Sequence, residues 1–170
     1  VGSEMCIRDR IERDALLYFV GKAGAAVGML AAIGLATRGL GAAAFAEFAL
    51  WSAVALWSAT ASVGWLQTGI GRLHRERRAG SRFAGYLASV RVALWLGAAT
   101  AGSIAASLTA LLSAQGLATA LAFGAMAAST ALFMGHQAVA LADLEARRVG
   151  RSDLVRGVAL PVATAIAILL

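Results

Sequence analysis

Three side chains able to carry positive charge stand among long apolar stretches of this chain: Lys22, Arg91 and His136. A charged group in such surroundings is costly unless it meets a partner, a water-filled cavity or a ligand of opposite charge. Arginine can hold a phosphate through two parallel hydrogen bonds, and lysine attracts one as a point charge. Together the three residues therefore predict a binding site for an anionic headgroup such as a diphosphate.

Each of the three residues also has an ordinary structural interpretation. The long stem of Lys22 can lift its ammonium to the nearest membrane interface, and the sequence leaves this open against a position in a cavity. Arg91 also fits among the arginines that flank an apolar span, and for His136 we favour a hydrogen bond between helices. The chain has no phosphate-binding glycine loop, no cluster of metal ligands and no nucleophile beside a base. We therefore expect neither an enzyme nor a metal or cofactor site.

The elements that must position these residues are membrane-spanning helices. From Val92 to Ala142 the chain has no Asp, Glu, Lys or Arg. At about 1.5 Å per residue, one helix of that length would be more than twice as long as a hydrocarbon core of about 30 Å is thick. We predict two spanning helices joined by a turn at Ser113 to Gly116. Hydrophobic residues make up 60% of the chain and charged residues 14%, as expected for a helical bundle in lipid.

The predicted fold is all-α and polytopic, with four complete transmembrane helices and the start of a fifth. The spans cover about 15–36, 45–64, 85–112 and 117–141, and the fifth runs from about 158 to 170. Residues 1–10 resemble the in-frame translation of a transposase sequencing adapter, so we exclude them and assign 11–170 to one transmembrane domain. The last residues stop inside an apolar run, and we expect the chain to be a fragment of a longer protein.

The first span also carries a stripe of small residues at helical spacing, namely Gly21, Gly24, Gly28 and Ala32. Small residues let helix backbones approach closely in a membrane. In a span so rich in alanine and glycine, we interpret the stripe as helix packing. Lys22 lies on a neighbouring face of the same helix, together with Tyr18.

The distribution of arginine predicts the orientation in the membrane, because short loops rich in Lys and Arg mark the cytoplasmic side. One side of the bundle, with predicted loops at 71–82 and 143–156, carries Arg13, Arg72, Arg75, Arg77, Arg78, Arg82, Arg91, Arg147, Arg148, Arg151 and Arg156, and the other carries only Arg38. We therefore expect the N-terminus in the cytoplasm. Contacts with anionic lipid headgroups are expected from Arg72, Arg75, Arg77, Arg78, Arg82, Arg147, Arg148 and Arg151. The net charge of +6 is thus explained by the membrane, and we expect no nucleic-acid partner.

Two segments resemble the O-antigen-type polysaccharide flippases of the multidrug/oligosaccharidyl-lipid/polysaccharide exporter superfamily. The stretch from Leu35 to Leu50 is similar to the pattern around the first periplasmic loop of that family, with matches at Arg38, Leu40, Gly41, Phe45, Ala49 and Leu50. Ala42, Ala46 and Phe48 replace the usual Pro, Gly and Tyr. The stretch from Val63 to Arg72 is similar to the end of the second helix in the same family.

The resemblance implies a multi-pass protein of the bacterial inner membrane, with twelve to fourteen helices in two bundles, of which this chain supplies part of the N-terminal one. Such a flippase moves an undecaprenyl-diphosphate-linked oligosaccharide across the membrane by alternating access, for polysaccharide or O-antigen synthesis. Its expected partners are the lipid bilayer, the lipid-linked substrate and glycan polymerase or assembly proteins. The resemblance also implies a place for Lys22 in the central cavity.

Two other functions stay open. A drug or cation antiporter of the same superfamily is expected to carry carboxylates within its spans for ion coupling. Apart from Glu47 at the outer end of the second span, the predicted spans contain none, which favours the flippase. From a different class, the chain fits a non-transporting membrane component of a glycan-assembly complex.

Overall fold

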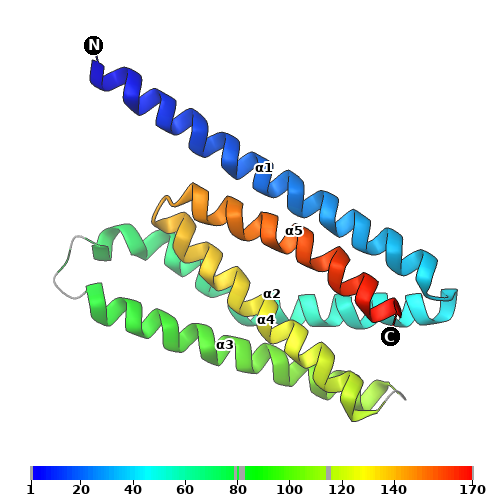
Figure 1. The fold of residues 1–170 in the computed structure, drawn as a ribbon. Helices are drawn as coiled ribbons and strands as arrows, with labels where there is room; N and C mark the ends of the chain where they lie inside the picture. The colour runs from blue at the N-terminus through cyan, green and yellow to red at the C-terminus, as the bar shows by residue number, and fades with distance from the viewer. Residues whose placement is uncertain (1, 79, 81–82, 114–115, 170) are drawn as a thin grey trace. The chain divides into compact units, whose positions relative to one another are not determined.

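The structure, a computed structural model, describes residues 2–78, 80, 83–113 and 116–169. These residues form only helices: α1 (Gly2–Gly39), α2 (Ala42–Arg78), α3 (Phe83–Leu112), α4 (Leu117–Ala142) and α5 (Ala146–Leu169) (Figure 1). Four stretches among them are long and apolar enough to cross a membrane: Glu12–Gly39, Ala42–His74, Phe83–Leu112 and Leu117–Ala142. The predicted all-α polytopic fold is confirmed.

Two of the loops expected from the sequence are mostly helical. A loop is expected at 71–82, whereas α2 continues through Arg78. Likewise α5 begins at Ala146, so most of the loop expected at 143–156 is helical. Arginine and alanine both favour the helix, and the 37 residues of α2 extend over about 55 Å. The charged end of α2 therefore leaves the hydrocarbon without any break in the helix.

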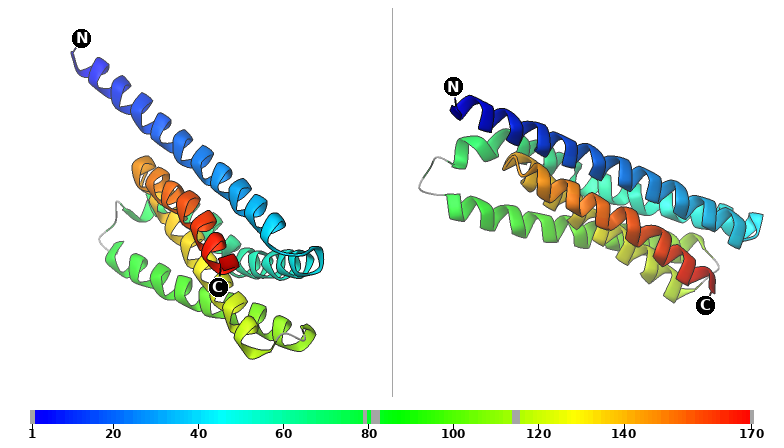
Figure 2. Two further views of the ribbon diagram at one scale, coloured as in Figure 1. Left: turned by 45° about the vertical axis from the view of Figure 1, so that its right-hand side comes forward. Right: turned by 45° about the horizontal axis from the view of Figure 1, so that its top comes forward.

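The chain divides into two compact units, one made of α1 and α5 and the other of most of α2 with α3 and α4. In the first unit α1 and α5 run parallel, as the ribbon shows from three sides (Figures 1 and 2). Gly21 packs against Gly150, and Gly28 packs against Gly157 about two turns further along both helices. An alternating membrane topology requires this parallel course, because three spans separate the end of α1 from the start of α5.

A glycine seam, formed by Gly21, Gly24 and Gly28 of α1 with Gly150 and Gly157 of α5, joins the two helices. A Cβ at Gly21 would lie 2.5 Å from the Cα of Gly150, and one at Gly157 would lie 2.5 Å from the carbonyl oxygen of Gly24. A Cβ at Gly28 would collide with the carbonyl oxygen of Gly157. Glycine hydrogens occupy these positions, so Cα–H groups face carbonyl oxygens across the seam. The packing role predicted for the α1 glycines is confirmed.

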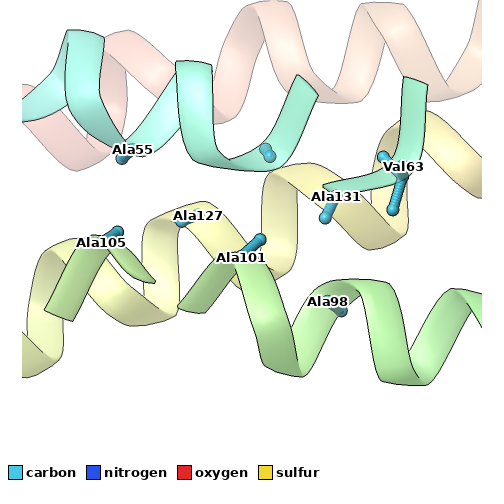
Figure 3. Close-up of a cluster of buried hydrophobic side chains, with 8 residues drawn as sticks. Ala55, Val63, Ala98, Ala101, Ala105, Ala127 and Ala131 are labelled. Atoms are coloured by element: carbon cyan, nitrogen blue, oxygen red, sulfur yellow. The ribbon is translucent and has the colours of Figure 1, made fainter. Parts of the chain in front are cut away.

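The second unit has a core of small side chains. Its buried cluster consists of Ala55, Ala59 and Val63 of α2, Ala98, Ala101 and Ala105 of α3, and Ala127 and Ala131 of α4 (Figure 3). In each helix these residues recur every three or four positions and so share one face. Short side chains allow close approach, and a Cβ at Gly102 of α3 would lie only 3.1 Å from the carbonyl oxygen of Gly124 of α4. Van der Waals packing of this kind drives helix association in lipid.

Candidate functional site

A salt bridge joins the two helices of the first unit. Nζ of Lys22 on α1 lies 2.8 Å from Oδ2 of Asp153 on α5. The side chain of Asp153 is only 5% exposed, whereas that of Lys22 is 43% exposed. The ammonium also stands 5.5 Å from the centroid of the Tyr18 ring, within the range of a cation–π interaction. Lys22 is thus held by protein partners on both helices.

The glycine seam sets the register of this salt bridge. Lys22 directly follows Gly21, and Asp153 comes just under one helical turn after Gly150. The backbone contact between the two glycines therefore brings the ammonium and the carboxylate to the same level. A second ion pair joins the same helices about two turns earlier on α1, where Nε of Arg147 lies 2.9 Å from Oδ1 of Asp14.

An apolar groove of about 600 Å³ lies along the α1–α5 pair. All of its lining residues are apolar, including Phe19, Val20, Leu154 and Val158. Lys22 is two residues from Val20, about 200° around the helix, and so projects from another flank of α1. The pair therefore presents an apolar flank that suits lipid and a charged flank that requires water or protein beside it.

The other two predicted binding residues lie in the second unit. Arg91 is exposed on α3, and His136 is exposed on α4. The two helices are close at this level, because Leu94 packs onto Gly135. A hydrogen bond from His136 to another helix stays a prediction. Convergence of Lys22, Arg91 and His136 on one ligand stays a prediction.

A buried cluster around His74 at the end of α2 was not predicted. The His74 side chain is 1% exposed, and its Nε2 lies 2.9 Å from Oδ1 of Asp143, the C-cap residue of α4. The same oxygen accepts a hydrogen bond of 3.1 Å from Arg78. The rings of Phe83 and Tyr86 in the first turn of α3 stand edge-on to the imidazole, at centroid distances of 5.4 and 5.8 Å. A single histidine within a run of arginines gives no sign of this contact in the sequence.

The arginines predicted to contact lipid headgroups lie near helix ends. On the last turns of α2 the exposed ones are Arg72, Arg77 and Arg78, and on the first turns of α5 they are Arg147, Arg148 and Arg151. Arg75 belongs to the helical part of α2, and Arg82 lies outside the described residues. The three arginines of α5 line a pocket of about 360 Å³ together with Asp14 and Glu145. Contact of these arginines with lipid stays a prediction.

The described helices define the chain as a membrane-embedded, all-α protein. No family model, curated protein or solved structure matches it. The resemblance of the stretch from Leu35 to Leu50 to polysaccharide flippases therefore stays a prediction from the sequence.

A buried carboxylate lies beside Lys22 although the predicted spans contain almost none. Asp153 belongs to α5 but precedes the predicted fifth span, which begins at about Val158. Among the described residues, α5 is not one of the helices long and apolar enough to cross a membrane. The shortage of carboxylates in the spans, which separates a flippase from an ion-coupled antiporter, therefore stays a prediction.

Proposed function

We propose that this chain is part of a flippase that carries an undecaprenyl-diphosphate-linked oligosaccharide from the inner to the outer leaflet of the bacterial inner membrane. Transport proceeds by alternating access and supplies polysaccharide or O-antigen synthesis. The observation that carries the proposal is the charged, accessible side chain of Lys22 on a membrane-spanning helix. The resemblance of the stretch from Leu35 to Leu50 to polysaccharide flippases supplies the substrate class.

The depth and exposure of Lys22 suit an anionic ligand. Lys22 lies about 10 Å along the helix axis from Ala15, where the predicted span begins, which corresponds to about a third of the way through a hydrocarbon core of about 30 Å. Charged groups at such depths commonly mark the pathway of a substrate or ion. An ammonium has three N–H donors, and its ion pair with Asp153 covers only one side of the nitrogen. The accessible side of Lys22 can therefore donate to a phosphate oxygen.

Asp153 favours a second candidate function, a drug or cation antiporter of the same superfamily. Carboxylates held within membrane helices serve as proton relays in transporters. Asp153 is comparable, because it is buried in α5 and paired with a lysine of the membrane-spanning helix α1. The two candidates differ in cargo and can be separated by one set of vesicle experiments.

The test uses the complete polypeptide that contains this chain, reconstituted in vesicles with a fluorescent undecaprenyl-diphosphate oligosaccharide. A membrane-impermeant quencher is added outside and reports the fraction of labelled lipid in the outer leaflet. Vesicles with active protein should lose nearly all fluorescence, because the labelled lipid exchanges between leaflets. Lys22→Gln should slow this loss, and Lys22→Arg, which keeps the charge, serves as the matched control.

Quenching that stops near half with the wild-type protein, as in protein-free vesicles, would refute the flippase. Efflux of a cationic dye driven by a proton gradient and abolished by Asp153→Asn would then establish the antiporter. Absence of both activities would leave one of the functions considered, that of a non-transporting membrane component of a glycan-assembly complex.

A further inference from the structure

We propose that Asp153 is a built-in competitor for the anion that Lys22 binds, which lowers the affinity of the site and lets the ligand leave. The inference rests on the proposed function, in which the ligand carries phosphate. It adds a residue to the predicted binding set and gives that residue a negative effect on affinity. Its basis is the 2.8 Å contact between Nζ of Lys22 and Oδ2 of Asp153.

The different exposure of Lys22 and Asp153 decides whether the site binds an anion or a cation. The side chain of Lys22 is 43% exposed, whereas that of Asp153 is 5% exposed. A ligand that approaches the pair therefore meets the ammonium first and finds the carboxylate behind it. An anion can bind to the accessible ammonium directly, but a cation would be repelled by it before reaching Asp153. The groove on the other flank is lined by apolar residues alone and offers no contact for a charge.

Asp153 opposes anion binding in two ways. Its carboxylate covers one side of the ammonium at 2.8 Å from Nζ, and its negative charge repels an anion bound to the same nitrogen. The carboxylate cannot easily withdraw, because it is buried and the contact between Gly21 and Gly150 fixes the spacing of the helices. A transport site must bind strongly enough to load and weakly enough to release. A fixed competitor beside the binding cation meets the second requirement.

The test measures binding to the complete polypeptide in nanodiscs of phosphatidylcholine. Farnesyl diphosphate is the lipid-anchored probe, inorganic pyrophosphate is the free probe, and calorimetry gives the Kd of each. Asp153→Asn should tighten binding by about tenfold, equivalent to one charge-assisted hydrogen bond. Lys22→Gln should weaken binding, and the double variant Lys22→Gln with Asp153→Asn should bind as weakly as Lys22→Gln.

The matched control is Glu47→Gln, which removes an acid from α2 in the other unit and should leave the Kd unchanged. Thermal unfolding of every variant is measured first, and Asp153→Ser provides a second neutral replacement if the Asn variant does not fold. If Lys22→Gln alone does not fold, the double variant takes its place in the binding measurement, because it lacks both charges of the Lys22–Asp153 pair.

The outcomes separate the inference from the function on which it rests. If Asp153→Asn binds the probes no more tightly than the wild type while the loss of Lys22 weakens binding, Asp153 is only a helix-to-helix contact and the inference is wrong. If the wild-type protein binds neither probe, the proposed function itself is contradicted. Tightening with farnesyl diphosphate alone assigns the site to a lipid headgroup, and equal tightening with pyrophosphate assigns it to a free anion. Both of these results support a competing role for Asp153.

Discussion

Nε2 of His74 lies 2.9 Å from Oδ1 of Asp143, and this bond joins the end of α2 to the end of α4. The first turn of α3 completes the contact through the rings of Phe83 and Tyr86. One imidazole therefore touches all three helices of the second unit. Because the arginine-rich end of α2 surrounds it, this junction lies at the charged end of the unit and outside its alanine core.

The first prediction concerns this junction. His74→Ala should destabilise the unit of α2, α3 and α4 by about 3 kcal/mol, because it opens a cavity and deprives Asp143 of a buried hydrogen-bond donor. Unfolding in mixed micelles of increasing denaturing detergent measures the change. Arg78→Ala is the matched control, since it removes the other donor to Asp143 from a side chain that is 61% exposed. The control should cost less than about 1 kcal/mol. Equal losses for both variants would contradict a special role for His74.

The second prediction concerns the glycine seam. Gly28→Ala should destabilise the α1–α5 unit by about 2 kcal/mol or more, because the new methyl group meets the backbone carbonyl of Gly157, which cannot rotate away. Gly34→Ala lies on the same helix with open space around it and should leave stability unchanged or slightly raised. A disulfide-trapping assay between cysteines placed on α1 and α5 reports the separation of the helices. Comparable trapping yields in the two variants would count against the seam.

The third prediction is an asymmetry between the partners of the Lys22–Asp153 pair. Lys22→Gln removes the ammonium that lies 2.8 Å from a buried carboxylate and should cost about 3 kcal/mol. Asp153→Asn leaves an ammonium whose side chain is 43% exposed and should cost less. The double variant should recover much of the loss caused by Lys22→Gln, as a double-mutant cycle of unfolding measurements would show. Additive losses would mean that the two side chains do not interact.

The fourth prediction tests the orientation expected from the arginines. In a background without other cysteines, cysteine is placed at Leu117, at the start of α4, or at Leu144, between α4 and α5; both positions are exposed. A membrane-impermeant maleimide added to intact bacterial cells should label the first variant and not the second. Permeabilised cells should show labelling of both. The reverse pattern in intact cells would place the N-terminus outside the cytoplasm.

The membrane-spanning part of this fold follows from the sequence, because the charge-free run from Val92 to Ala142 is suited to the hydrocarbon core of a membrane. The ends of α2 and α5 do not follow. Arginine favours a helix in water as it does at a membrane surface, so hydropathy locates the edge of the lipid and not the end of the helix. The predicted limits of the turn at Ser113 to Gly116 are confirmed, since α3 ends at Leu112 and α4 begins at Leu117.

The candidate site is predictable only in part. Lys22 stands out as a lone charge among apolar residues, and its neighbour Tyr18 follows from helical spacing. Its acidic partner does not, because Asp153 follows 153 − 22 = 131 positions later in a stretch that has the composition of a loop. The pairing depends on which glycines of α1 and α5 meet, and that register is a property of the packed helices.

The contact between Gly21 and Gly150 also bears on how the protein is made, because 150 − 21 = 129 positions separate the two residues. A ribosome adds about 5–20 residues per second, so α1 exists for roughly 6–26 s before its partner helix is synthesised. Throughout that interval Lys22 lacks its carboxylate, and the glycine face of α1 is covered by lipid or by the insertion machinery. The packing of α1 is thus completed by a helix that is synthesised three helices later, and biogenesis depends on whatever shelters a lone lysine in the meantime.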